Sequence, residues 1–121
     1  MYQHIVEGQE LFKVSAQGYG QPITTFASTD SGETPMSLLN IALASCLTMC
    51  VQGYFAKQSS REIPPVTVHS NYDDGIFTVS FTLGYPIPEK ERQELIDYVN
   101  SKCRVKAMLR EDLCYRFSFV E

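Results

Sequence analysis

The sequence lacks the cysteine and histidine patterns that mark disulfide-rich and metal-binding proteins. Its four cysteines, at positions 46, 50, 103 and 114, form no C-x-x-C pair, and in a reducing compartment they are not a disulfide framework. The two histidines, His4 and His69, lie in predicted strands without metal-ligand spacing to any cysteine. We therefore expect no metal and no other cofactor, and each cysteine is considered as a thiol.

Clusters of positive charge and long apolar runs are also missing. Ten Lys and Arg residues against fourteen Asp and Glu give a net charge of -4, with no basic cluster to neutralise a phosphate backbone. The N-terminus has no basic segment followed by an apolar one, so we expect no signal peptide and a cytoplasmic protein. The most apolar stretch, Met36 to Phe55, is interrupted by polar residues and falls short of the roughly 18 unbroken apolar residues of a membrane span. Neither nucleic acid nor a membrane is an expected partner.

What remains is the composition of an ordinary globular protein. The hydrophobic fraction is 44%, with seven Phe and seven Tyr, and no segment is repeated or low in complexity. A chain of 121 residues fits one domain that buries roughly two-thirds of its unfolded surface. We expect a single domain over residues 1–121.

Periodicity in the first half predicts a sheet followed by a long helix. The short apolar runs Glu10–Val14 and Ile23–Phe26, separated by Gly and Pro, indicate a small antiparallel sheet. Thr34 and Pro35 fit the N-cap and first position of a helix that continues to about Lys57. This helix is apolar on nearly every face, which is typical of a helix surrounded by protein.

The second half predicts a hairpin, two helices and a last strand, so the fold class is α+β. Val66–Tyr72 and Ile76–Leu83 alternate as strands on either side of an Asp-Gly turn. A helix begins at Pro88 and Glu89, a short helix covers Cys103–Leu109, and a strand covers 115–120. The expected inner face of the longer helix consists of Leu95, Ile96, Val99 and Cys103.

Two of the cysteines lie where a thiol could react. Cys46 lies in mid-helix on a stripe of mostly small side chains, so its own helix terminus cannot lower its pKa and another part of the fold must. Cys103 lies near the start of the short helix between Lys102 and Arg104, which favours ionisation. Cys50 and Cys114 are interpreted as packing residues.

The context of these two cysteines resembles the OsmC/Ohr family. The run from Thr34 to Met49, TPMSLLNIALASCLTM, resembles the family's central helix, which starts at a proline and carries a cysteine after small residues. The segment Cys103–Arg110 resembles its second motif, in which a cysteine opens a short helix and is typically followed by proline, here Arg104. The 57-residue separation and the intervening elements agree over essentially the whole chain. The chain is similar to a divergent OsmC-like member.

The resemblance implies a fold, an assembly and a reaction. The fold would be OsmC-like, with antiparallel sheets around a long buried central helix, in an intertwined homodimer. The activity would be a thiol-dependent peroxidase of the oxidative stress response: Cys46 would attack an organic hydroperoxide, Cys103 would resolve the sulfenic acid as a disulfide, and a dithiol would reduce it. The helix around Cys46 offers an apolar substrate pocket, although core packing explains each residue equally well. The predicted pocket residues are Met36, Leu39, Leu43 and Met49.

The chain departs from the family at two positions that activate the reactive cysteine. The glutamate that follows the helix-starting proline is Met36 here, and the first arginine is Arg61, so the N-terminal arginine is missing. Glu33, Arg104 and Arg110 are the candidate substitutes. The alternative is a non-catalytic dimer of the same fold that binds a small apolar ligand or acts as a slow thiol redox sensor.

Overall fold

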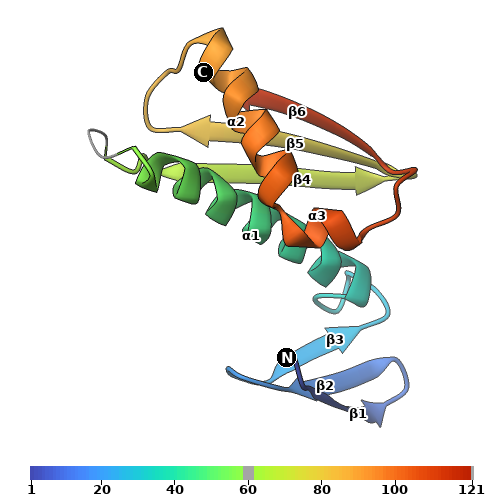
Figure 1. The fold of residues 1–121 in the computed structure, drawn as a ribbon. Coiled ribbons are helices and arrows are strands. Elements are labelled where there is room, and N and C mark those ends of the chain that lie inside the picture. Colours follow the sequence, from blue (N-terminus) through green and yellow to red (C-terminus); the bar gives the residue numbers. More distant parts are fainter. Residues whose placement is uncertain (59–61, 121) are drawn as a thin grey trace. The chain divides into compact units, whose positions relative to one another are not determined.

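The computed structural model describes residues 1–58 and 62–120 (Figure 1). Contacts divide the chain into two compact units, Met1–Leu39 and Asn40–Glu121, and the long helix α1, Pro35–Ala56, begins in the first and continues in the second. The candidate site lies wholly in the second unit, so each unit is described by itself. The one-domain prediction for residues 1–121 stays a prediction.

The first unit contains a three-stranded antiparallel sheet in the order β1-β2-β3. Its strands are β1 (Ile5–Glu10), β2 (Lys13–Gln17) and β3 (Ile23–Phe26). The predicted small sheet is confirmed, but the run Glu10–Val14 is not one strand, because the chain turns at Leu11 and Phe12, where Phe12 has φ 61°. Every β1 residue is exposed, so this sheet has little core of its own.

Helix α1 starts where the sequence predicts. The hydroxyl of Thr34 accepts a hydrogen bond from the N–H of Ser37 (3.1 Å), and the Thr34 N–H donates to the Ser37 hydroxyl (2.7 Å), which is the reciprocal pattern of a capping box. One stripe of the helix is fully buried: Leu43, Leu47, Val51 and Phe55. Apolar residues off this stripe, such as Ile41 and Met49, are exposed in the single chain.

By length and composition α1 is also apolar enough to cross a membrane. Its fully buried stripe, with members four residues apart, packs in the core of the second unit, as expected of the core helix of a folded domain.

The second unit contains the sheet β4-β5-β6, with β4 (Val66–Asp73), β5 (Ile76–Leu83) and β6 (Cys114–Val120). The first two strands form the predicted antiparallel hairpin, and β6 pairs parallel to β5. Asp74 and Gly75 both have positive φ, 45° and 80°, as a two-residue type I′ turn requires. Phe77, Val79 and Phe81 alternate inward along β5 and form the sheet's share of the core.

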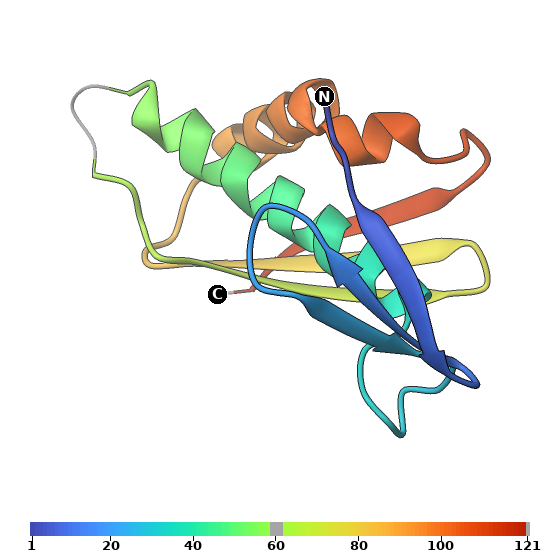
Figure 2. The same ribbon diagram turned by 90° about the horizontal axis from the view of Figure 1, so that it is seen from below.

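Two helices connect β5 to β6, as a parallel pairing demands. Helix α2 covers Glu89–Lys102, with Pro88 as its N-cap, and the single turn and a half of α3 covers Arg104–Met108. Helices α1, α2 and α3 lie on the same face of the sheet (Figures 1 and 2). Leu95 and Val99 are buried in α2 as predicted, whereas Ile96 is half-buried. Cys103, at the junction of α2 and α3, belongs to this core.

Candidate functional site

The thiols of Cys46 and Cys103 meet in the second unit. Cys46 is half-buried on α1, one helical position before the buried Leu47, while Cys103 is 2% exposed between α2 and α3. The Cys103 thiol donates a hydrogen bond to the sulfur of Cys46. Both are free thiols. The fold therefore brings together the two cysteines that the sequence singled out.

Backbone hydrogen bonds at the α2–α3 junction hold Cys103 in place. Its N–H donates to the carbonyl of Val99 (2.9 Å) and closes α2, while its carbonyl accepts from Ala107 (3.2 Å) and opens α3. Its backbone is extended, with φ −71° and ψ 109°, so the chain breaks the helix at this residue and turns. Its Sγ also accepts from the N–H of Lys106 (3.4 Å) as the N-cap of α3.

Four donors converge on the sulfur of Cys46. Burial alone raises the pKa of this thiol, but the N–H groups of Val105 and Arg104 and the thiols of Cys103 and Cys50 together lower it below its ordinary value. Hydrogen bonds to the charged form favour that form, so the arrangement stabilises a thiolate. The first turn of α3 thus supplies the donors from outside α1 that a mid-helix cysteine needs to lower its pKa.

The prediction that the position of Cys103 favours its ionisation is wrong. Burial raises its pKa, and its hydrogen bond to Cys46 raises it further. The free N–H groups at the start of α3 do favour a thiolate, as expected, but two of them are directed at Cys46. In this geometry Cys46 is the thiol whose pKa is lowered, and Cys103 is the hydrogen-bond donor beside it.

The other two cysteines occupy different environments. Cys50, one helical turn after Cys46, packs against the core and donates to the Cys46 sulfur; burial and the neighbouring sulfurs raise its pKa to about 11. It therefore remains a protonated donor at neutral pH. The packing interpretation fails for Cys114, because this residue is exposed at the start of β6.

An open hollow of about 360 Å³ lies beside the Cys46 thiol. Its walls come from the second half of α1, from the C-terminal part of α2 and from the first residue of α3. The lining residues are Cys46, Met49, Cys50, Gly53, Lys57, Tyr98, Lys102 and Arg104. Lys57 and Tyr98 were not among the residues predicted from sequence, because they are distant from both cysteine motifs, and Lys102 was considered only as a neighbour of Cys103.

The four residues predicted to form an apolar pocket do not line this hollow together. Met49 does line it. Leu43 is fully buried and belongs to the core cluster instead. Met36 and Leu39 belong to the first unit, where Met36 is exposed and Leu39 half-buried.

Of the candidate substitutes for the missing glutamate and arginine, Arg104 alone lines the Cys46 hollow among the residues described. The carboxylate of Glu33 accepts a hydrogen bond from the Ser37 hydroxyl (2.8 Å) in the first unit. The guanidinium of Arg110 is bound to Asp112, outside the thiol cluster. Backbone N–H groups of α3 lower the pKa of Cys46, an effect that the sequence analysis expected from a charged side chain.

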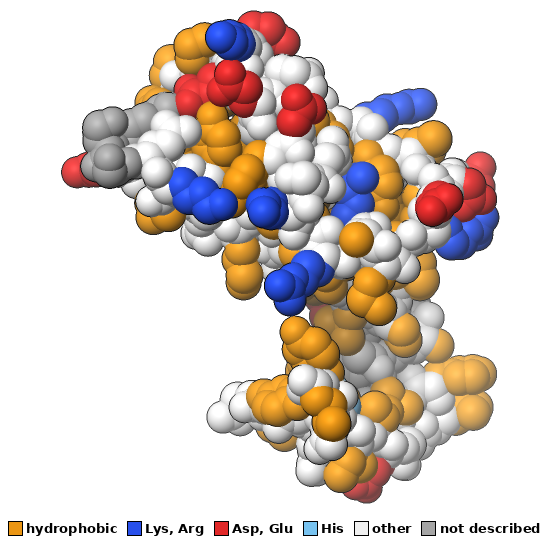
Figure 3. All heavy atoms as spheres, in the orientation of Figure 1, with side chains coloured by type: hydrophobic (Ala, Val, Ile, Leu, Met, Phe, Trp, Pro, Cys, Tyr) orange, Lys and Arg blue, Asp and Glu red, His pale blue; other side chains and the backbone are white. Residues whose placement is uncertain are grey.

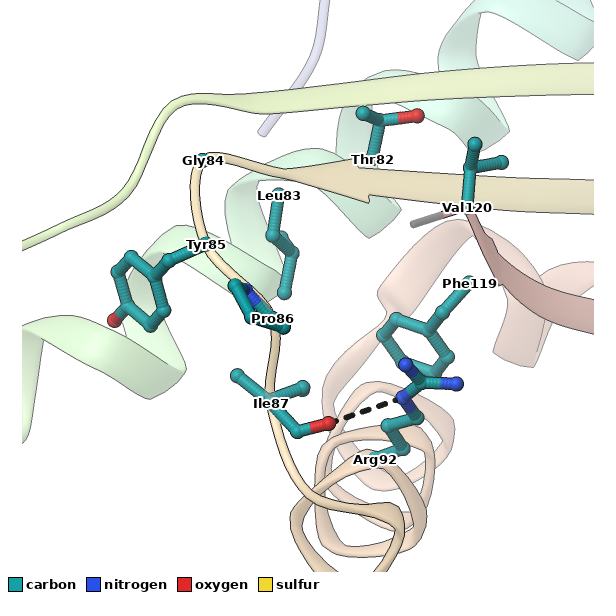
Figure 4. A pocket seen from close by; sticks show the side chains of 9 residues that line it. All are labelled: Thr82, Leu83, Gly84, Tyr85, Pro86, Ile87, Arg92, Phe119 and Val120. Atoms are coloured by element: carbon teal, nitrogen blue, oxygen red, sulfur yellow. Dashed lines mark hydrogen bonds between the residues drawn. The ribbon is translucent and has the colours of Figure 1, made fainter.

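A second hollow, of about 420 Å³, lies at the ends of β5 and β6 and contains no thiol (Figure 4). Its walls are mostly apolar, and the Nε of Arg92 donates to the carbonyl of Ile87 (3.2 Å) at its edge. Within residues 1–58 and 62–120, no group of three His, Cys, Asp or Glu side chains is arranged to hold a metal ion. The thiol cluster is therefore the candidate site.

The fold and site define a class: an α+β protein in which a central helix presents a thiol to a second thiol at the start of a short helix. The model of the OsmC-like protein family matches residues 28–113. The chain belongs to this family.

Solved structures of low sequence identity share the fold. A hypothetical protein of Aquifex aeolicus VF5 superimposes with a TM-score of 0.80 at 16% identity, over 99% of this chain and 95% of its own. An OsmC-like protein of Mycoplasma pneumoniae gives 0.71 at 18% identity, over 99% and 96%. The organic hydroperoxide resistance protein OhrB of Bacillus subtilis gives 0.72 at 12% identity, over 99% and 98%. No curated protein matches the sequence significantly.

Proposed function

We propose that the protein is a thiol-dependent peroxidase that reduces organic hydroperoxides, with Cys46 as the attacking thiol and Cys103 as the resolving thiol. The observation that carries the proposal is the convergence of four hydrogen-bond donors on the Cys46 sulfur, one of them the Cys103 thiol. A thiolate is the nucleophilic form of cysteine, and the second thiol stands in contact with it.

The proposed reaction has three balanced steps. The Cys46 thiolate attacks the terminal oxygen of the hydroperoxide; an S–O bond forms, the O–O bond breaks, and the alkoxide takes a proton to leave as an alcohol. The Cys103 sulfur then attacks the sulfur of the Cys46 sulfenic acid, which forms the disulfide and releases water. A dithiol reductant finally exchanges with the disulfide, restoring both thiols and becoming a disulfide itself.

Family membership supports this proposal, and the geometry offers a replacement for the missing residues. A protein of this fold from Bacillus subtilis is named for organic hydroperoxide resistance. The glutamate and arginine of the family pattern are absent, but the N–H groups of Arg104 and Val105 lower the pKa of Cys46 without them. Backbone donors of this kind need no charged side chain.

We also propose that the protein works as a homodimer. Apolar side chains on the sheet of the first unit are exposed, among them Ile5 (63%), Val6 (60%) and Phe12 (70%). A three-stranded sheet with little core of its own is marginal in water, so a second chain would supply further contacts. Sedimentation equilibrium would find a dimer if this is correct and a monomer otherwise.

The test of the peroxidase is single-turnover oxidation with one equivalent of cumene hydroperoxide. We expect the wild type to lose two thiols and form a Cys46–Cys103 disulfide by intact mass and peptide mapping. Cys103→Ser should accumulate sulfenic acid on Cys46, and Cys46→Ser should not react. Cys114→Ser is the matched control, because this exposed thiol lies outside the cluster. Equal peroxide consumption by Cys46→Ser and wild type would contradict the proposal.

The departures from the family pattern favour a second candidate, a slow redox sensor or ligand-binding dimer. Met36 and the lack of an arginine before Arg61 remove two groups that activate the thiol in the family pattern. A sensor would form the same disulfide without supporting multiple turnovers. Sustained consumption of hydroperoxide in the presence of dihydrolipoamide would separate the peroxidase from this alternative.

A further inference from the structure

Every charged residue described in the wall of the hollow beside Cys46 is cationic. Lys57, Lys102 and Arg104 line it, and none of its eight described lining residues is acidic. This contrasts with the chain as a whole, whose net charge is -4. Three positive charges close together on a protein of negative net charge create a local positive electrostatic potential beside the thiol.

Three helix ends produce this charge arrangement. Lys57 directly follows α1, Lys102 is the last residue of α2, and Arg104 is the first of α3. Figure 3 shows Lys and Arg side chains gathered where α1 passes α2 and α3, while Asp and Glu gather over the other end of α2. The Nζ of Lys57 lies 5.1 Å from the centre of the Tyr98 ring, a cation–π contact that holds this ammonium group beside the hollow.

The remaining walls make the hollow amphipathic. Met49 and the ring of Tyr98 provide apolar surface. Gly53 has no side chain, and a Cβ there would fill part of the hollow, in van der Waals contact with the Tyr98 hydroxyl at 3.7 Å. A molecule with an apolar body and an anionic end would satisfy both parts of this wall. An uncharged hydroperoxide would leave the three cations without a partner from the substrate.

We infer that the hollow recognises hydroperoxides that carry a carboxylate, with Lys57, Lys102 and Arg104 as the specificity-determining residues. This inference rests on the proposed function for its reaction. The cations attract the carboxylate end, and the O–O bond reaches the sulfur of Cys46 from the apolar side. These three residues, the cationic rim of the hollow, select the substrate and take no part in bond breaking.

The first test uses two hydroperoxides that differ in one charge, cumene hydroperoxide and its para-carboxylate. At low salt we expect the carboxylate to oxidise Cys46 about tenfold faster, a typical gain from a cleft of one charge sign. The ratio should fall toward one near 1 M salt, where the Debye length is about 3 Å. Lys57→Gln and Lys102→Gln should each lower the ratio severalfold, and Lys102→Glu should lower it most. Lys90→Gln, the same charge change at the other end of α2, should leave the ratio unaltered.

A second test does not depend on peroxide chemistry. In a Cys114→Ser background, the attack of Cys46 on a dianionic aryl disulfide, 5,5′-dithiobis(2-nitrobenzoate), is compared with attack on neutral 2,2′-dithiodipyridine. The anionic-to-neutral rate ratio, normalised to that of a small free thiol, should exceed one in the wild type and fall in the Lys57 and Lys102 variants. Oxidation by both hydroperoxides with no anion preference in either pair would overturn the cationic rim and leave the peroxidase standing. An anion preference for the disulfides without any hydroperoxide reaction would overturn the peroxidase and support recognition of anions.

Discussion

The backbone N–H of Val105 donates a hydrogen bond to the thiol of Cys46. This contact joins the middle of α1 to the first turn of α3, and the N–H of Arg104 adds a second donor. In the family pattern a proline typically stands at the Arg104 position, and proline has no N–H. The chain thus has a backbone donor that the family pattern lacks, while it lacks the glutamate and the arginine that the pattern has.

Removing this extra donor should raise the pKa of Cys46. Arg104→Pro deletes the N–H at the first position of α3, where proline is tolerated, and the extended backbone of Cys103 is compatible with a following proline. Arg104→Gln is the control, because it removes the same charge and keeps the N–H. The pH midpoint of Cys46 alkylation by iodoacetamide should be higher in Arg104→Pro than in Arg104→Gln. Equal midpoints would show that this N–H does not matter.

The three clustered thiols should titrate in a fixed order. The pKa of Cys46 is lowered, so its thiolate survives as pH falls, whereas Cys103 and Cys50 have raised values, that of Cys50 about 11. Pulsed alkylation over roughly pH 6 to 10, read by peptide mapping, should label Cys46 first at every pH in this range. Earlier labelling of Cys103 would reverse the proposed roles of the two thiols.

The buried stripe of α1 should dominate the stability of the second unit. Leu47 is fully buried in the core cluster, so Leu47→Ala should lower the free energy of unfolding by about 2–5 kcal/mol. Met108, which is 89% exposed, offers a control at which alanine should change it by about 0.5 kcal/mol or less. Urea unfolding followed by circular dichroism measures both. A small loss for Leu47→Ala would mean that the site collapses around the cavity.

The hairpin turn between β4 and β5 should be sensitive to a single methyl group. Gly75 has φ 80°, and a Cβ there would meet no atom within 4 Å, so the cost of Gly75→Ala is backbone strain alone. We expect about 1 kcal/mol of destabilisation. Gly20 has equally open space and no positive φ, so Gly20→Ala should be neutral or slightly stabilising. Equal effects of the two substitutions in thermal unfolding would show that the turn conformation does not decide the outcome.

Local signals predicted most of the elements. Thr34 and Pro35 marked the start of α1, Asp74 and Gly75 marked the hairpin, and Pro88 marked the start of α2 within one residue. Such signals depend on neighbouring residues only, so they can be read without the fold. The run Glu10–Val14 correctly indicated a sheet but not the bounds of its strands, because the run includes the turn at Leu11 and Phe12.

The candidate site could be predicted only in part. The local context of Cys46 and Cys103 indicated the pair, but the short helix was expected to favour ionisation of Cys103, and its first N–H groups instead lower the pKa of Cys46. A helix terminus acts on whatever sulfur its N–H groups face, and that direction depends on how α3 crosses α1. The cationic hollow could not be predicted either, because Lys57 and Lys102 come together only through the packing of three helix ends.

The sequence by itself determined the α+β class and the boundaries of the helices and of the hairpin, because capping, turn chemistry and periodicity act over a few residues. It also indicated the two cysteines that the fold brings together. Tertiary structure alone decided that Cys46 receives the donors of α3, that the pKa of Cys103 is raised, and that three cations line the hollow beside Cys46. Hydrogen bonding and electrostatics act through space, so they depend on distances that residue order does not specify.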